Sequence, residues 1–125
     1  MTDDAIMILL SEIQKAIDNK SLATALKFYH PDIIYIGPAF PEPVLGLDAL
    51  EKAFGRNFQG IQKTKVNFSN VNIHRLSGDS FVVYCQIEGT QSIHFSSRNF
   101  KGWLTRVFVD AGTSARIIHE HFSLR

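Results

Sequence analysis

Two histidines, His119 and His121, stand two residues apart near the end of the chain. Their surroundings have the alternation of a β-strand, whose successive side chains point to opposite faces, so we predict that both imidazoles share one face with Ile117. Glu120 and Phe122 then take the other face. Imidazole exchanges a proton near neutral pH and can bind a ligand, whereas an interior histidine often only satisfies protein hydrogen bonds. The pair therefore leaves structural, ligand-binding and acid–base roles open.

Zinc binding is the other chemistry that paired histidines suggest. Positions i and i+2 on a strand could supply two ligands, but a zinc site needs a third and usually a fourth. No cysteine or carboxylate cluster supplies them at a suitable spacing. We therefore expect no metal and no cofactor.

Arg106 is the second candidate, in a predicted strand that puts it on one face with Leu104 and Phe108. A guanidinium among apolar neighbours needs an anionic partner. Because arginine stays protonated, we expect Arg106 to bind a carboxylate or form an ion pair rather than to move protons. Glu88 would be either a buried general base or a structural partner for Arg106. Tyr35 either lines an interior hollow or packs in the core.

Three helices and one short strand are predicted in the first half of the chain. Apolar residues recur at helical spacing over residues 3–19, Ser21 is a candidate cap for a short second helix that includes Tyr29, and residues 33–37 read as a buried strand. A proline-rich loop follows. Asp48, with Glu51 three residues later, has the spacing of a capping box for a third helix.

From Thr64 onward the hydrophobic period changes to two, which indicates strands. We predict strands to residue 76, over 80–91, over 99–109 and over 115–124, with an ambiguous connection at 93–98. A phase change near Ser69 and Asn70 predicts a bulge that bends the sheet. Helices on one side of an antiparallel sheet make an α+β fold, and a strongly bent sheet would enclose a cone-shaped cavity.

The strand face opposite Arg106 carries Trp103, Thr105 and Val107. An exposed apolar sheet face on a small protein usually marks a subunit contact. We therefore predict a homodimer through this face, extended by Phe122 on the last strand.

Composition narrows the classes of partner. The 125 residues fit one domain, 1–125, with 45% hydrophobic residues and a formal charge of +1. The basic residues are scattered, so no nucleic-acid partner is expected. The apolar run at residues 5–10 is too short to cross a bilayer, so no membrane partner is expected. A lone cysteine, Cys85, excludes an intrachain disulfide and favours a cytoplasmic location.

The order of elements, together with residues 46–50 and 117–123, resembles the SnoaL-like branch of the nuclear transport factor 2-like (NTF2-like) superfamily. Residues 105–108, followed after a turn by residues 119–123, look most like the association domain of calcium/calmodulin-dependent protein kinase II. The resemblance implies a cone-shaped pocket and a dimer formed by packed sheet faces. In those association domains the arginine matching Arg106 faces the pocket and can meet a carboxylate, and a second pocket arginine falls at about Glu88. The resemblance therefore implies an Arg106–Glu88 pair.

The ketosteroid isomerase branch of the same superfamily places its catalytic aspartate immediately before the residue matching Pro38. Here that position is Gly37. Glycine cannot take up a proton, so steroid isomerase activity is not expected.

Three hypotheses about function follow. The first is a homodimeric protein that binds a small, partly apolar organic molecule through Tyr35, Glu88, Arg106, His119 and His121. The second is an isomerase, cyclase or dehydratase in which His119 or Glu88 transfers a proton and Tyr35 or Arg106 stabilises an oxyanion. The third is an oligomerisation module with a vestigial pocket.

Overall fold

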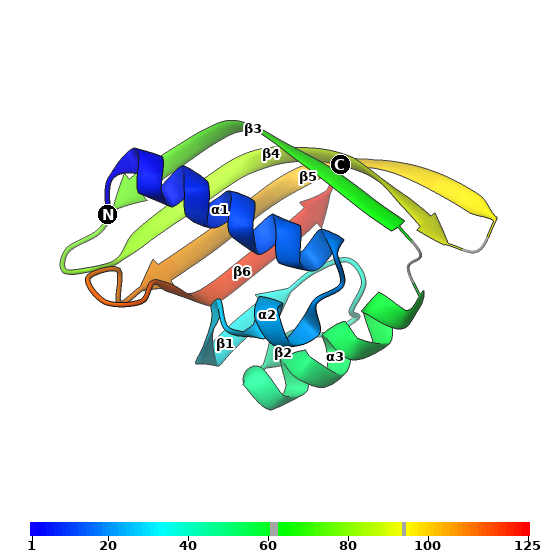
Figure 1. Cartoon of the computed structure of the whole chain (residues 1–125), viewed down its shortest axis with the longest axis horizontal. Coiled ribbons are helices and arrows are strands. Elements are labelled where there is room, and N and C mark those ends of the chain that lie inside the picture. The colour runs from blue at the N-terminus through cyan, green and yellow to red at the C-terminus, as the bar shows by residue number, and fades with distance from the viewer. Residues whose placement is uncertain (61–62, 94) are drawn as a thin grey trace.

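A curved, unclosed six-stranded sheet forms the body of the molecule, and three helices cover its inner face (Figure 1). The computed structural model describes residues 1–60, 63–93 and 95–125. The helices are α1 (Asp3–Asp18), α2 (Leu22–Leu26) and α3 (Leu47–Gly60), and the strands are β1 (Tyr29–Ile36), β2 (Val44–Leu45), β3 (Lys63–Arg75), β4 (Phe81–Ile93), β5 (Ser96–Val109) and β6 (Arg116–Leu124). The α+β class predicted from the sequence is confirmed.

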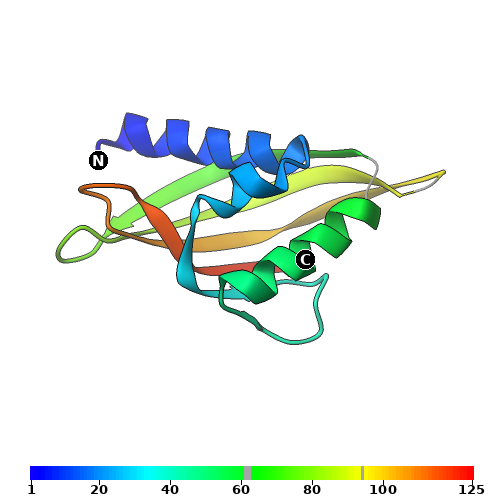
Figure 2. The same ribbon diagram turned by 60° about the horizontal axis from the view of Figure 1, so that its bottom comes forward.

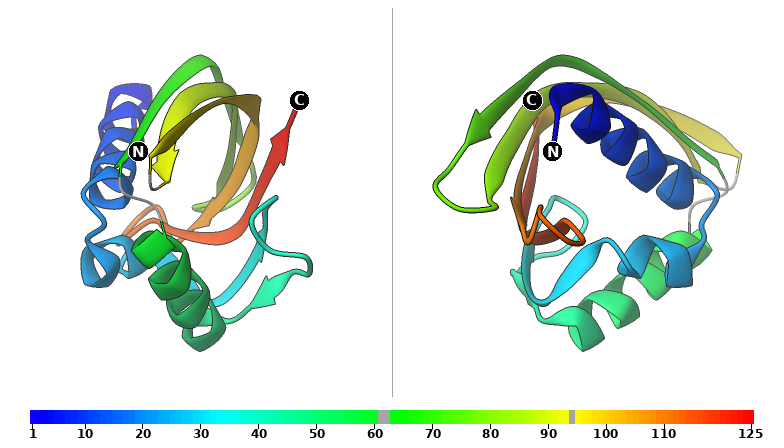
Figure 3. Two further views of the ribbon diagram at one scale, coloured as in Figure 1. Left: turned by 90° about the vertical axis from the view of Figure 1, so that its right-hand side faces the viewer. Right: turned by 60° about the vertical axis from the view of Figure 1, so that its left-hand side comes forward.

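The strands follow the order β2-β1-β6-β5-β4-β3 across the sheet. Strands β3 to β6 form an antiparallel meander, while β1 pairs with β6 in parallel. Figure 3 shows the long strands curving around α1. Figure 2 shows α3 lying near β1, toward the opposite edge of the sheet from β3. The inner face of the sheet and the three helices therefore enclose the interior.

Helix α1 forms where the sequence predicts it. The Thr2 hydroxyl accepts a hydrogen bond from the Ala5 N–H at 3.1 Å, and two aspartates occupy the first turn, where the helix dipole favours negative charge. The buried face carries Ile6, Leu10 and Ile13. These apolar side chains hold the helix against the inner face of the sheet, in the main core cluster.

The second helix begins after Ser21 as predicted, but its details and the start of α3 differ from the prediction. The Ser21 side chain makes no capping hydrogen bond, and Tyr29 lies in β1 rather than in the second helix, so β1 begins earlier than residue 33. Helix α3 begins at Leu47, which puts Asp48 inside its first turn instead of at the cap. The chain enters α3 through Gly46, whose φ of 88° is open to glycine and strained for other residues.

The strand register shifts in the β1–β6, β3–β4 and β5–β6 pairings. The predicted bulge at Ser69 and Asn70 is confirmed, because the β3–β4 register shifts there and Asn70 has a φ of 51°. A second shift in the β5–β6 pairing was not predicted. Ile117 pairs with Phe108 and His119 with Val107, so Ile118 is an extra residue in β6. The predicted connection at 93–98 is a strand from Ser96, while residue 94 lies outside the described residues.

Close packing between β5 and β6 requires glycine at position 102. A Cβ on Gly102 would collide with the backbone carbonyl of Ser123 on β6. The absence of a side chain there lets β5 and β6 approach each other beside the inner core cluster of Cys85, Ile87 and Leu104.

No helix in the described part of the chain is long and apolar enough to span a membrane.

Candidate functional site

An interior hollow of about 330 Å³ lies between the inner face of the sheet, α1, α3 and the loop after β1. Its walls are mainly apolar and include Val66, Phe68, Ile87, Leu104 and Phe122. These side chains come from alternate positions of β3 to β6, so the strand period that builds the core also lines the hollow.

A buried ion pair lies in the wall of this hollow. Arg106 and Glu120 are only 2% and 3% exposed, and they are direct partners in the β5–β6 register. The Arg106 Nε–H donates to Glu120 Oε1 at 2.7 Å, and the Tyr29 hydroxyl donates to the same oxygen at 2.9 Å. Glu120 therefore neutralises the guanidinium, and Tyr29 fixes the carboxylate.

One nitrogen of this guanidinium is left over. Arg106 Nη1 is buried and has no hydrogen-bond partner within the described residues. A buried donor without an acceptor destabilises a protein by about 1–3 kcal/mol, so such groups are rare and each needs an explanation. Arg106 is also one of the residues that line the hollow.

Protonation states at this end of the hollow are well defined. Burial alone would lower the pKa of Arg106, but the adjacent Glu120 carboxylate raises it above its usual value, so the guanidinium stays charged. Burial, and then the Glu120 charge, raise the pKa of Tyr35 and of Tyr29 well above 10. Both phenols therefore remain protonated, and the Tyr29 hydroxyl donates to Glu120.

Tyr35 lines the hollow, as one of its two predicted roles requires. Its ring packs edge-on against Phe40 and Phe54, with centroids 5.7 and 5.3 Å away. A Cβ on Gly37 would lie 3.0 Å from the Tyr35 ring, so the position that carries the base in ketosteroid isomerases has little space for a side chain here.

The two histidines lie on the other side of the sheet from Arg106. His119 pairs with Val107 and His121 with Thr105, and neither histidine lines the hollow. The prediction that they share the face of Ile117 is wrong, because the extra residue Ile118 reverses the faces of all later side chains in β6.

Glu88 is also outside the hollow. It alternates with the buried Ile87 on β4, is exposed, and forms an ion pair of 3.8 Å with Lys101, its direct neighbour on β5. The implied Arg106–Glu88 pair is therefore wrong, and Glu120 takes the place of Glu88. The same placement removes His119 and Glu88 from any proton transfer within the hollow.

The outer face of the sheet carries partly exposed aromatic residues. Trp103 is 44% exposed and Tyr84 is 43% exposed, and Thr105 and Val107 alternate with the buried side chains of β5. Phe122 was predicted on this face, but it lines the inner hollow and its ring packs 6.1 Å from that of Phe100. The bulge at Ile118 explains this error as well.

Sequence reasoning missed Glu120 as the partner of Arg106, and Tyr29 as the donor that holds Glu120. The sequence did offer a signal, a carboxylate on the strand that follows the strand of Arg106. The register that brings this carboxylate and the guanidinium together depends on the turn and the bulge between them.

In the described residues, no group of three or more histidine, cysteine, aspartate or glutamate side chains is arranged to hold a metal ion.

The curved sheet, the helices on its inner face and the enclosed hollow define an NTF2-like fold. Residues 6–125 match the family model of the SnoaL-like domain, so the chain belongs to that family. No curated protein matches the sequence.

Solved structures with the same fold share little sequence with this chain. An NTF2-like superfamily protein from Salmonella enterica is 17% identical, with a TM-score of 0.85 over 97% of this chain and 89% of that one. A protein from Xanthomonas campestris assigned to the calcium/calmodulin-dependent protein kinase II association domains is 18% identical, with a TM-score of 0.84 over 97% and 86%. The β subunit of benzoate 1,2-dioxygenase from Burkholderia mallei is 16% identical, with a TM-score of 0.84 over 100% and 91%. At these identities the likeness establishes the fold alone.

Proposed function

We propose that the protein binds a small, partly apolar organic molecule in the interior hollow, with a hydrogen-bond acceptor of that molecule against Arg106 Nη1. The observation that carries this proposal is that Arg106 lines the hollow while its buried Nη1 donor has no hydrogen-bond partner among the residues that the structure describes. The Tyr35 hydroxyl, from the same wall, is a second donor for the same end of the ligand. The apolar side chains of β3 to β6 would contact the remainder.

Glu120 supports binding rather than chemistry at the buried end. Its Oε1 already accepts hydrogen bonds from Tyr29 and Arg106, so that oxygen is committed to holding the guanidinium. The family fold occurs in enzymes, of which the benzoate dioxygenase β subunit is an example, and in association domains. For this chain the unpartnered donor favours binding over an assembly module with a vestigial pocket.

The proposal includes a homodimer formed through the outer face of the sheet. Trp103, Thr105 and Val107 would lie at its centre, and the correction of β6 adds His119 and His121 to the same face. The exposed rings of Trp103 and Tyr84 support this assignment, because large aromatic side chains are enriched at subunit contacts. We also propose a cytoplasmic location, from the single cysteine.

Blocking the hollow tests the binding proposal. Val66 lines the hollow from β3, so Val66→Trp fills it, and Leu76→Trp, at an exposed site after β3, is the matched control. Both variants and the unmodified protein are purified, and native mass spectrometry measures any retained small molecule. We expect a bound compound in the unmodified protein and in Leu76→Trp, and none in Val66→Trp. Equal retention by all three proteins, or none by any, would contradict the proposal and favour the assembly module.

A further inference from the structure

The hollow runs along the strands and has an arginine at each end. Strand β5 contributes Arg106, Leu104, Phe100 and Arg98 to its wall in that order. The two arginines are eight positions apart, which is roughly 26 Å along an extended strand and less where the sheet curves. Arg106 is buried, whereas Arg98 is exposed, so Arg106 marks the deep end and Arg98 marks the mouth.

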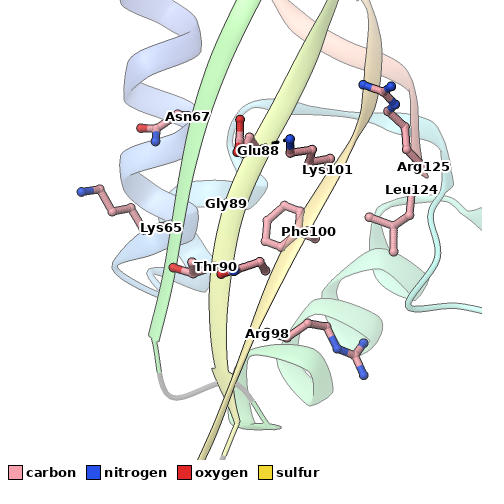
Figure 4. A pocket seen from close by; sticks show the side chains of 11 residues that line it. Lys65, Asn67, Glu88, Gly89, Thr90, Arg98, Phe100, Lys101, Leu124 and Arg125 are labelled. Carbon is pink, nitrogen blue, oxygen red and sulfur yellow. Dashed lines mark ion pairs between the residues drawn. The ribbon is translucent and has the colours of Figure 1, made fainter.

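A groove with several basic residues adjoins this end of the hollow. Its Lys65, Glu88 and Lys101 alternate along their strands with residues that line the hollow, so these side chains point to the other face of the sheet. This groove, of about 910 Å³, shares Arg98, Phe100 and Leu124 with the hollow and is also lined by Lys65, Lys101 and Arg125. Figure 4 shows Arg98, Leu124 and Arg125 along one side of β5, with Lys65 extending from β3 on the far side of the groove. Lys101 is paired with Glu88, but within the described residues no ion pair involves Arg98 or Arg125.

The two arginines differ in charge compensation. Glu120 already neutralises Arg106, so a ligand carboxylate at the deep end would add a second anion beside one cation in a poorly solvated site. Arg98 has no such partner and remains accessible to water. An anionic group is therefore favoured at Arg98, and an uncharged acceptor such as a carbonyl oxygen is favoured at Arg106.

We infer that the ligand is an elongated acid whose anionic group lies at Arg98 and whose uncharged oxygen accepts a hydrogen bond from Arg106 Nη1. This inference rests on the proposed function and differs from the expectation that Arg106 itself meets a carboxylate. At about 30 Å³ for a group the size of a water molecule, 330 Å³ holds about eleven such groups, so most of a chain of about twelve carbons fits inside and its carboxylate lies at the mouth beside the exposed Arg98.

Three matched probes separate the two ends of the ligand. They are dodecanoate, which has the acid alone, a twelve-carbon methyl ketone, which has the carbonyl alone, and the keto acid that carries both groups at opposite ends of a twelve-carbon chain. Their affinities are measured by isothermal titration calorimetry with the unmodified protein. We expect the keto acid to bind most tightly, since it alone satisfies both arginines.

Arg98→Gln tests the mouth, with Lys101→Gln as the control. Lys101 lies in the same groove but does not line the hollow. We expect Arg98→Gln to weaken the keto acid and dodecanoate about threefold to fivefold and to leave the ketone unchanged, as an exposed ion pair predicts. Lys101→Gln should leave all three affinities unchanged.

Two results would overturn the inference. One is equal weakening of the acids by both substitutions, which would indicate a general effect of surface charge. The other is acid binding that is insensitive to Arg98→Gln, which would place the anion elsewhere. Either result leaves the proposed function intact if the ketone still binds and Val66→Trp abolishes its binding. If Val66→Trp leaves the affinities of all three probes unchanged, the proposed function itself fails.

Discussion

Replacing Glu120 by glutamine removes the charged partner of the buried Arg106 and keeps the shape of the side chain. The N–O distance of 2.7 Å corresponds to a Coulomb attraction of about 6 kcal/mol at an effective dielectric constant of about 20, before desolvation is counted. Measured losses on breaking a buried pair from one side are about 3–5 kcal/mol. We therefore expect Glu120→Gln to lower the free energy of unfolding by about 3–5 kcal/mol.

The assay is urea unfolding followed by circular dichroism and by Trp103 fluorescence, at one fixed protein concentration. Glu88→Gln is the matched control, because it removes the same charge from an exposed pair of 3.8 Å. This control should lower the free energy of unfolding by less than about 1 kcal/mol. A pair worth 3–5 kcal/mol is a large fraction of the 5–15 kcal/mol that is typical of a whole domain.

A double variant distinguishes loss of the partner from loss of packing. Arg106→Met together with Glu120→Leu removes both charges, so no uncompensated ion remains inside, and it should be more stable than Glu120→Gln alone. If Glu120→Gln lowers the free energy of unfolding by less than 1 kcal/mol, Arg106 is not held by Glu120 in the way described, and the reasoning about charge at the deep end fails.

Two further predictions concern the alkaline limb of stability and the subunit contact. The pKa of Tyr35 is higher in the folded protein than the value of about 10 in the unfolded chain, so its contribution to the free energy of unfolding is present below pH 10 and is lost above it, at up to about 1.4 kcal/mol per pH unit. Urea titrations at high pH should show that the free energy of unfolding falls less steeply with pH in Tyr35→Phe than in the unmodified protein. An unchanged slope would argue against the burial of Tyr35. Trp103→Glu places charges at the centre of the proposed interface and should give monomers in sedimentation velocity, with Leu76→Glu, at an exposed site after β3, remaining dimeric. A Trp103→Glu protein that stays dimeric would exclude this face.

Helix α1, the α+β class and the bulge near Asn70 could be predicted because each leaves a local signal. Apolar spacing marks the buried face of α1, and a phase change in β3 marks the bulge. Arg106 among apolar neighbours likewise predicted a buried guanidinium that needs a partner.

The partner of Arg106 could not be predicted, because it depends on register rather than on local pattern. One extra residue, Ile118, moves His119 and His121 to the outer face and brings Glu120 and Phe122 inside. Strand alternation fixes which residues share a face only while the pairing is regular. The same bulge therefore accounts for the misplaced histidines, the misplaced Phe122 and the missed carboxylate.

The most direct test of the account is a crystal structure of the protein with the twelve-carbon keto acid bound. The account predicts a carbonyl oxygen at hydrogen-bond distance, about 2.7–3.2 Å, from Arg106 Nη1, with the chain along β5 and the carboxylate at Arg98. A ligand bound outside the hollow, with Arg106 Nη1 still without an acceptor, would contradict it.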